Sequence, residues 1–414
     1  MNLERIINTD IEFIDGDRGQ NYPSKSDFFE NGYCVFLNTG NITRNGFDFS
    51  KLDFITEEKD KSLRKGKVKS DDIILTTRGT VGNVALVTET IKYANMRINS
   101  GMVIIRSKKD FTPLFLNTFF RSELFKKQAL TNGSGSAQPQ LPISALKNIS
   151  IPKLDKKTQA KITSVLSALD EKIALNNQIN AKLEQMAKTL YDYWFVQFDF
   201  PDDNGKPYKS SGGEMVYNET LKRDIPKGWE VKSLWQIANY FNGLALQKYR
   251  PTDEEYLPVI KIREMNEGIS SNTEKASPDI PQNAIIDDGD ILFSWSASLD
   301  VMIWNQGKGA LNQHIFKVTS EQYPKSFYYF ELLNYLKHFK MMAELRKTTM
   351  GHITQDHLKQ AYICIPKIEL LEVMENKLKP IFDKNLILHK ENRQLAKLRD
   401  WLLPMLMNGQ VTVQ

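Results

Sequence analysis

The sequence predicts a mixed α/β (α+β) fold with two globular regions in a pseudo-twofold tandem repeat, separated by two long antiparallel coiled-coil helices. Three observations predict it: segments that recur in both halves, short β-like runs between turn residues, and heptad apolar periodicity that closes each half. The 414 residues are 41% hydrophobic and 25% charged. This is ordinary globular composition, which excludes disordered and collagen-like chains, and the length suggests two to three domains.

The repeat consists of four pairs of similar segments that occur in the same order in both halves. The pairs are 13–16 with 240–243, 73–87 with 290–304, 146–153 with 358–367, and 170–173 with 383–386. A single weak match can arise by chance, whereas four in order indicate a duplicated chain. We therefore expect the two halves to share one fold.

Each half has the same order of predicted elements. Short β-like runs are expected at 33–37, 73–77 and 102–106, and again at 257–262, 290–294 and 315–318. Helical stretches follow at about 113–130 and 324–346, and a long helix then closes each half. Residues 194–230 between the halves are rich in Gly, Pro, Asp and Ser and predict a surface linker whose first aromatic residues pack at the helix end. The predicted domains are 1–154, 155–196 (helix), 197–224 (linker), 225–367, and 368–414 (helix and tail).

The closing helices are the clearest structural signal. Positions seven residues apart are Ile162, Leu169, Asn176, Leu183 and Leu190 in the first helix, and Met374, Ile381, Leu388, Leu395 and Leu402 in the second. Intermediate interface positions are Val165, Leu166, Ile173, Ile179 and Met186, then Leu378 and Leu398. Such heptads predict a coiled coil. Antiparallel pairing within the chain is favoured, and dimerisation through the helices is the alternative.

Two polar or helix-breaking residues interrupt these patterns. Asn176 falls on the apolar interface, where a buried polar residue costs stability but fixes register; the alternative is a half-exposed position. Pro380 lies inside the second periodic run, so we expect a break or kink there, with the long part of the helix beginning nearby.

The chain shows no sign of export, membrane insertion or catalysis. Its N-terminus lacks a signal-peptide pattern, and its apolar stretches are too short to span a bilayer. Cys34 and Cys364 supply neither a disulfide framework nor a cysteine zinc site. No phosphate loop, HExxH or GxSxG motif occurs. His352 and His357 flank Asp356 with a spacing that favours a loop or helix cap over a metal site. We expect a cytoplasmic protein with no catalytic residue, bound metal or cofactor of its own.

Basic residues point to nucleic acid. The net charge of +5 is small, but six basic residues lie between 59 and 69, which would bind phosphates or form a solvated loop. Arg78 follows a β-like run, and Arg is the commonest reader of guanine. The Asn312-Gln313-His314 run offers polar groups for base edges, or a strand end. The predicted DNA-binding residues are Arg18, Arg44, Arg64, Lys65, Lys67, Lys69, Thr76, Thr77, Arg78, Lys248, Arg250, Lys261, Arg263, Ser294, Trp295, Ser296, Gln313 and His314.

Taken together, the motifs resemble the specificity subunit of type I restriction-modification systems. The residues that carry the resemblance are 15–25, 74–79, 135–140 with 151–152, 170–173, 194–195, 225–230, 289–296, and Gly351 with 365–366. They span essentially the whole chain. Two departures affect single base contacts: the first half lacks the Pro-x-Gly-Trp entry of 226–229, and it has Thr-Thr-Arg-Gly where the second half has Ser-Trp-Ser.

The resemblance implies two target-recognition domains, each reading half of a split double-stranded DNA target, with the helices setting the gap. It implies a non-catalytic chain to which two modification subunits dock and restriction subunits are added. The assembled complex would use S-adenosylmethionine, ATP and Mg. The alternatives are a specificity subunit of a related, non-type-I restriction system, a coiled-coil scaffold with protein-binding ends, and an enzyme with its own chemistry.

Overall fold

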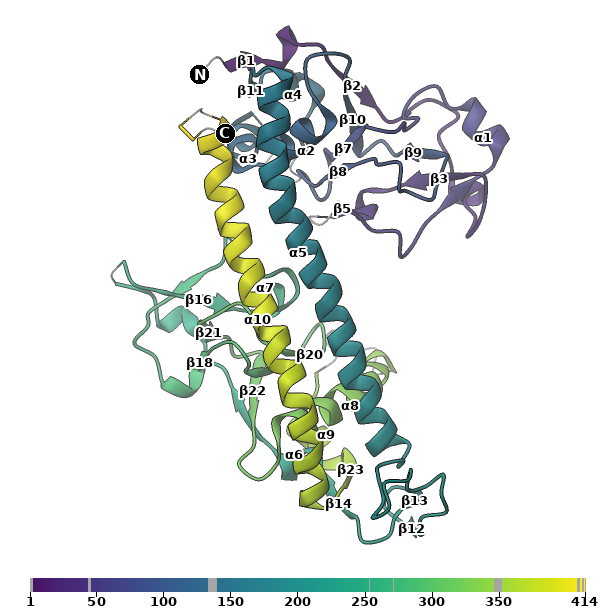
Figure 1. Cartoon of the computed structure of the whole chain (residues 1–414), viewed down its shortest axis with the longest axis vertical. Coiled ribbons are helices and arrows are strands. Elements are labelled where there is room, and N and C mark those ends of the chain that lie inside the picture. Colours follow the sequence, from purple (N-terminus) through teal and green to yellow (C-terminus); the bar gives the residue numbers. More distant parts are fainter. Residues whose placement is uncertain are drawn as a thin grey trace. The chain divides into compact units, whose positions relative to one another are not determined.

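Two compact units make up the computed structural model, which describes residues 3–43, 46–132, 140–252, 254–270, 272–345, 352–407, 410, 411 and 413. The first unit is Met1–Lys172 with Leu395–Gln414, and the second is Ile173–Gln394. The two longest helices in Figure 1, α5 (Lys156–Tyr191) and α10 (Ile368–Met407), each contribute to both units. Each unit therefore holds one globular region and part of each long helix.

The first globular region is built on an antiparallel four-stranded sheet with the order β2-β10-β7-β8. These strands are β2 (Ile11–Asp15), β10 (Met102–Ser107), β7 (Ile73–Thr76) and β8 (Val84–Leu86). A second sheet has the order β6 (Phe54–Ile55), β3 (Cys34–Leu37), β9 (Met96–Ile98), and the pairs β1 (Leu3–Arg5) with β11 (Ser150–Pro152) and β4 (Ile42–Thr43) with β5 (Gly46–Phe47) complete the strands. The helices are α1 (Glu57–Ser62), α2 (Pro113–Arg121), α3 (Glu123–Asn132) and α4 (Ile143–Lys147).

The second globular region repeats this plan. Its antiparallel sheet has the order β15 (Asn239–Asn242), β22 (Ile315–Thr319), β19 (Ile291–Ser294), β20 (Asp300–Ile303). The other sheet has the order β17 (Lys275–Ala276), β16 (Leu257–Ile260), β21 (Gly309–Leu311), β18 (Ile285–Ile286), and β14 (Glu230–Ser233) pairs with β23 (Tyr362–Ile365). The helices are α6 (Leu234–Ile237), α7 (Ile262–Glu267), α8 (Lys325–Leu345) and α9 (Gln355–Gln360).

The shared topology confirms the duplication read from the sequence. In both regions the chain enters the main sheet at an edge, and a parallel strand pair occurs at the same place, β3 with β9 and β16 with β21. The predicted β-like runs correspond to β3, β7, β10, β16, β19 and β22. The second half departs after β16, where α7 begins at Ile262 instead of the strand continuing.

Local sequence explains why α2 covers the first sheet. Thr112 caps the helix by accepting a hydrogen bond from the Phe115 amide at 3.3 Å, and Pro113 occupies the first turn, where its missing N–H costs nothing. Phe115, Leu116, Phe119 and Phe120 then recur on one face and are buried against the apolar face of β7, β8 and β10. This packing fixes the strands from which the functional loops emerge.

Helices α5 and α10 pack together in antiparallel fashion. Asp170 pairs with Arg399 at 2.8 Å, and further along α5 Glu184 accepts a hydrogen bond from Asn385 at 3.0 Å. Asn176 is fully buried, and its amide nitrogen donates to Glu391 and to Asn392 of α10, each at 2.9 Å. Pairing within one chain is therefore present, and Asn176 occupies the interface as its heptad position predicted.

Three expectations about the helices were wrong. Helix α10 runs from Ile368 to Met407 through Pro380 without a break, because the burial of Leu378 and Met374 in the apolar core outweighs the roughly 3 kcal/mol that a proline costs inside a helix. Met186 and Leu398 are 59% and 42% exposed, so neither lies in the interface. The apolar interface between α5 and α10 therefore includes fewer heptad positions than the sequence pattern predicted.

The segment between the halves is ordered around aromatic residues. A short π-helix, Asp192–Val196, ends α5, and Trp194 and Phe195 are buried at this end as predicted. The Phe200 and Trp229 rings stack at 5.3 Å. A hairpin of β12 (Met215–Asn218) and β13 (Arg223–Pro226) follows, and most residues from 201 to 224 are exposed, so this part of the segment runs over the surface.

Candidate nucleic-acid interface

The main sheet of each region presents its functional loops at one end. In an antiparallel sheet, the ends of β2 and β7 lie beside the start of β10, as the pairs Asp15–Val103 and Thr76–Met102 show. We define the first loop end as residues 16–20, 63–66, 77–83 and 99–101. The second loop end, at the equivalent edge of β15, β19 and β22, comprises residues 243–250, 295–299 and 312–314.

Both loop ends are held by the same backbone contact. A Cβ on Gly16 would lie 2.2 Å from the carbonyl oxygen of Asn99, and a Cβ on Gly243 would lie 2.3 Å from that of Asn312. Only glycine permits such an approach. These two glycines belong to the repeat that the sequence revealed, so their conservation between the halves has a steric cause.

A buried hydroxyl shapes the turn after β7 and after β19. Ser294 Oγ donates to the Ser298 carbonyl at 2.7 Å and accepts from the Asp300 amide at 2.8 Å. Thr76 Oγ1 donates to the Thr80 carbonyl and accepts from the Asn83 amide at 3.0 Å. Thr76 is therefore the structural equivalent of Ser294. Aligning 73–87 with 290–304 in the sequence had placed Thr77 opposite Ser294, one residue away.

Four of the predicted DNA-contact residues are therefore buried within the turns themselves. Thr76 and Ser294 are fully buried, and Thr77 and Ser296 are 8% and 4% exposed. Thr77 Oγ1 donates to the Gly101 carbonyl at 3.0 Å. This geometry favours a role in shaping the turns over direct contact with a ligand.

The first loop end projects exposed basic side chains. Arg78 stands in the β7–β8 turn and is exposed, and its side chain has no hydrogen bond or ion pair to any residue that the structure describes. Arg18 is 48% exposed and contacts Asp15 at 3.2 Å and the Ser100 carbonyl at 3.3 Å. Arg64 and Lys65 are also exposed. Arg44 lies outside the described residues.

The structure divides the basic run from 59 to 69. Lys59, Lys61 and Lys67 form ion pairs with Asp27, Glu57 and Asp60, at 3.2, 2.8 and 2.6 Å. These three lysines are thus tied to acidic side chains. Only Arg64 and Lys65 of the run belong to the first loop end.

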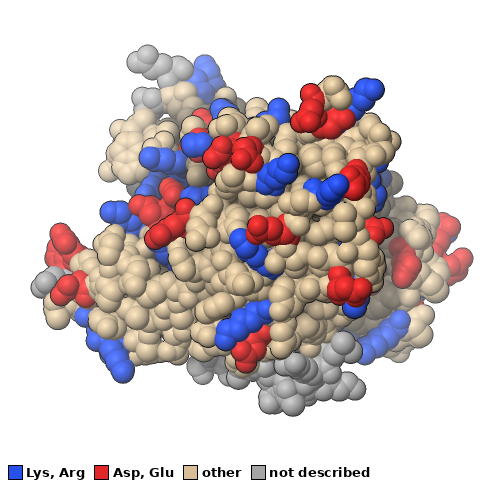
Figure 2. All heavy atoms as spheres, turned by 90° about the horizontal axis from the view of Figure 1, so that it is seen from below, with Lys and Arg blue, Asp and Glu red and all other residues tan. Residues whose placement is uncertain are grey.

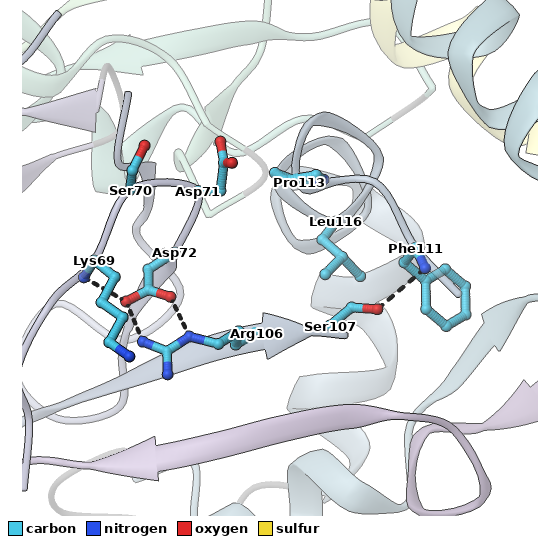
Figure 3. A pocket seen from close by; sticks show the side chains of 9 residues that line it. All are labelled: Lys69, Ser70, Asp71, Asp72, Arg106, Ser107, Phe111, Pro113 and Leu116. Carbon is cyan, nitrogen blue, oxygen red and sulfur yellow. Dashed lines mark hydrogen bonds and ion pairs between the residues drawn. The ribbon is translucent and has the colours of Figure 1, made fainter. Parts of the chain in front are cut away.

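Lys69 lies at the opposite end of β7, beside a shallow pocket (Figure 3). There the fully buried Asp72 binds Arg106 through both carboxylate oxygens, at 2.7 and 2.8 Å, and this ion pair raises the pKa of Arg106. The Lys69 amide donates to Asp72 at 2.8 Å. The charges of Asp72 and Arg106 neutralise each other. This ion pair therefore joins the start of β7 to β10.

The second loop end is aromatic instead of basic at its centre. Trp295 donates from its indole nitrogen to Asn242 Oδ1 at 3.0 Å, and its ring lies 5.7 Å from His314 and 5.6 Å from His352. His314 is exposed and Gln313 is half-buried. These groups form a stacking and hydrogen-bonding surface.

The basic residues of the second region fall into two groups. Lys248 and Arg250 are exposed on the second loop end. Lys261 instead pairs with Glu274, and Arg263 pairs with the buried Glu264 at 2.6 Å. The exposed pair is therefore the better candidate for phosphate contacts.

The family profile "Type I restriction modification DNA specificity domain" matches residues 10–185 and 226–397. The chain belongs to this family. It is thus a DNA specificity subunit of a type I restriction-modification system, a non-catalytic part of that complex, as the sequence motifs predicted.

Known specificity subunits cover most of this chain. It is 26% identical to the type I restriction enzyme MjaIX specificity subunit of Methanocaldococcus jannaschii, over 87% of this chain and 82% of that protein. It is 24% identical to the HindI specificity subunit of Haemophilus influenzae, over 97% of this chain and 99% of that protein. The crystal structure of the S subunit from M. genitalium has the same fold, with a TM-score of 0.50 and 14% identity over 98% of this chain and 95% of the other.

The surface of the specificity subunit agrees with its small net charge. On the face shown in Figure 2, Lys and Arg side chains are interspersed with Asp and Glu. No helix among the described residues is long and apolar enough to cross a membrane, and these residues contain no cluster of three His, Cys, Asp or Glu side chains suited to a metal.

Sequence reasoning missed several residues of the loop ends in the specificity subunit. Asp17 is buried within the first loop end, Arg97 is buried beside it, and Asn242 orients Trp295 in the second. The Asp-Gly-Asp-Arg-Gly run at 15–19 was the one available signal, since a carboxylate among glycines is typical of a tight loop.

Proposed function

We propose that each globular region reads one half of a bipartite DNA sequence, with the first and second loop ends as the reading surfaces. The observation that carries this proposal is that the two loop ends share one backbone frame but differ in their projecting side chains. Arg78 occupies the place of Ser296, and Thr77 the place of Trp295. A common frame with different side chains suits two readers that recognise different bases.

The long helices would set the distance between the halves and dock two modification subunits. Large apolar side chains are exposed on them: Leu175 and Met186 on α5 and Ile387 and Trp401 on α10, between 51% and 59%. Aromatic side chains and Met are enriched in protein–protein interfaces, so Met186 and Trp401 are the first candidates for docking contacts. Restriction subunits would join this assembly.

The chemistry would belong to the partner subunits. The modification subunits would bring S-adenosylmethionine and flip an adenine for methylation, and the restriction subunits would bring ATP and Mg²⁺. The specificity subunit contributes orientation, because its buried hydroxyls, glycines and ion pairs fix the loops that face DNA.

Co-expression with the modification subunit of the same system, followed by sequencing of adenine methylation in host DNA, tests this function. We expect a split motif with two short specific halves and a fixed gap. A stable, active complex that methylates a continuous motif would refute the two-reader proposal. A stable complex without any motif would favour a protein-binding scaffold.

A further inference from the structure

A buried carboxylate holds the amides of the loop 63–66 in the first region. Asp17 is 5% exposed, and its Oδ2 accepts hydrogen bonds from the backbone amides of Arg64 at 2.6 Å and Lys65 at 3.3 Å. Its Oδ1 accepts from the Gly19 amide at 2.7 Å. These amides, that of Gly19 foremost, lower the pKa of Asp17, so the carboxylate is ionised at neutral pH.

A buried guanidinium holds the carbonyls of the same loop. Arg97 is 7% exposed and donates from Nη1 to the Lys65 carbonyl at 2.7 Å and from Nη2 to the Leu63 carbonyl at 3.1 Å. Its Nε binds the carboxylate of Asp60 at 2.6 Å, which also binds Lys67. The backbone of residues 63–65 is therefore fixed on both sides by charged, buried groups.

Two side chains of this loop, those of Arg64 and Lys65, face solvent. Neither makes a side-chain hydrogen bond or ion pair with any residue in the described ranges, while the charge of Arg64 adds to the amides in lowering the pKa of Asp17. Gly19 makes room for Arg64, since a Cβ there would lie 2.4 Å from the Arg64 Nη2 atom. Two charges on a fixed backbone lose little conformational entropy when they meet a ligand, which is how preorganised sites gain affinity.

The second region lacks this arrangement. The backbone register places Leu244 where the first region has Asp17, and Ala310 where it has Arg97. The pair Asp17 and Arg97, which we call the clamp, is therefore a property of the first region and not of the fold that both regions share. A purely structural device would be expected in both copies.

We propose that Asp17 and Arg97 are positioning residues that hold Arg64 and Lys65 against the DNA phosphates beside the half-site read by the first region. The proposal rests on DNA recognition by this chain and adds which residues aim its phosphate contacts. Phosphate contacts fix the register of a reader on the duplex. Loss of the clamp should thus affect one side of the split target.

The experiment uses the complex with modification subunits and a DNA duplex carrying the methylated motif. Ethylation interference locates the phosphates that the complex contacts, and a salt titration counts them. For the double variant Arg64→Ala/Lys65→Ala we expect interference to disappear at phosphates on one side of the gap, and the slope of log K against log salt to fall by about 2. Asp17→Asn should lose interference at the same phosphates.

Asp72→Asn is the matched control, because Asp72 is another buried aspartate at the same sheet that accepts a backbone amide. It pairs with Arg106 (Figure 3) and precedes β7, at the end of that strand opposite to the first loop end. It should lower the melting temperature without changing the interference pattern. An unchanged pattern and slope in the double variant would overturn the proposal. So would an Asp17→Asn complex that melts earlier but keeps every phosphate contact. Failure of DNA recognition itself would appear differently, as absence of specific binding by the wild-type complex.

Discussion

Arg78 is the side chain best placed to read a base. It projects from a turn whose backbone is fixed by buried hydroxyls and glycine, so its position does not depend on a flexible loop. Arg78→Ala should cost about 1–3 kcal/mol of discrimination at one base pair of one half-site, the usual value of an arginine–guanine contact. Competition binding of the complex to single-base variants of its motif would measure this. Unchanged preference at both half-sites would refute the assignment.

Ser294 tests the turn of the second loop end. Ser294→Ala removes one donor and one acceptor from a fully buried turn and leaves the Asp300 amide without its partner. We expect a loss of about 1–3 kcal/mol in the free energy of unfolding, measured by urea denaturation. Ser294→Thr is the matched variant, because Thr76 makes the same hydrogen bonds in the first region. If the threonine variant is as unstable as the alanine variant, the hydroxyl does not carry the turn.

At this scale the sequence could predict residues that the repeat or a local motif marks, and no others. Gly16 and Gly243 were visible as a pair, and Arg78 followed a β-like run. Asp17 and Arg97 were not visible, because their partners are 47 and 32 residues away in the chain and are brought together by the sheet. The six basic residues from 59 to 69 looked equivalent for the same reason, since the sequence does not show which of them meet a carboxylate.

Asn176 carries the specificity of the helix pair. It is fully buried, and its oxygen has no hydrogen-bond partner among the residues that the structure describes, so it costs stability while its nitrogen fixes the register against Glu391 and Asn392. Asn176→Leu should therefore raise the melting temperature and loosen the register. The complex should then methylate targets whose gap differs by one base pair, which sequencing of adenine methylation would detect. A variant that melts lower and keeps a single gap length would contradict this reading.

Glu331 of α8 binds Tyr191 at the end of α5, within the second unit. This contact makes the stability of that unit depend on pH. Burial raises the pKa of Glu331 to about 7, against the hydrogen bond that the Tyr191 hydroxyl donates to it at 2.7 Å. The native chain therefore keeps a proton on this carboxyl between about pH 4.5 and pH 7, where the unfolded chain has lost it. Stability should fall as pH rises through this window.

Glu331→Gln removes the titration but keeps an acceptor for Tyr191. We expect the variant to lose less stability than wild type between pH 5 and pH 7.5, as measured by thermal unfolding at both values. The neighbouring charges are Arg223, Lys188 and Asp192, which stay the same in both proteins. An equal loss in the two proteins would assign the pH dependence to other groups.

Element types were predictable where periodicity was long, and their ends were not. Heptads placed α5 and α10 and the position of Asn176 in their interface. They could not show that α10 continues through Pro380, because the compensating burial of Leu378 and Met374 comes from residues far away in the sequence. Exposure of Met186 has the same cause, since the heptad pattern does not say how wide the partner's apolar stripe is.

For the whole molecule, the small net charge of +5 means that DNA affinity must come from a few placed cations. The loop ends expose six of them: Arg18, Arg64, Lys65, Arg78, Lys248 and Arg250. If each meets one phosphate, these residues contribute about 5 to the slope of log K against log salt, since each neutralised phosphate contributes about 0.9. Lys248→Ala/Arg250→Ala should lower the slope by about 2 in the complex, whereas Lys261→Ala, which removes a lysine already paired with Glu274, should leave it unchanged. A slope near zero for the wild-type complex would mean that the loop ends meet protein instead of DNA.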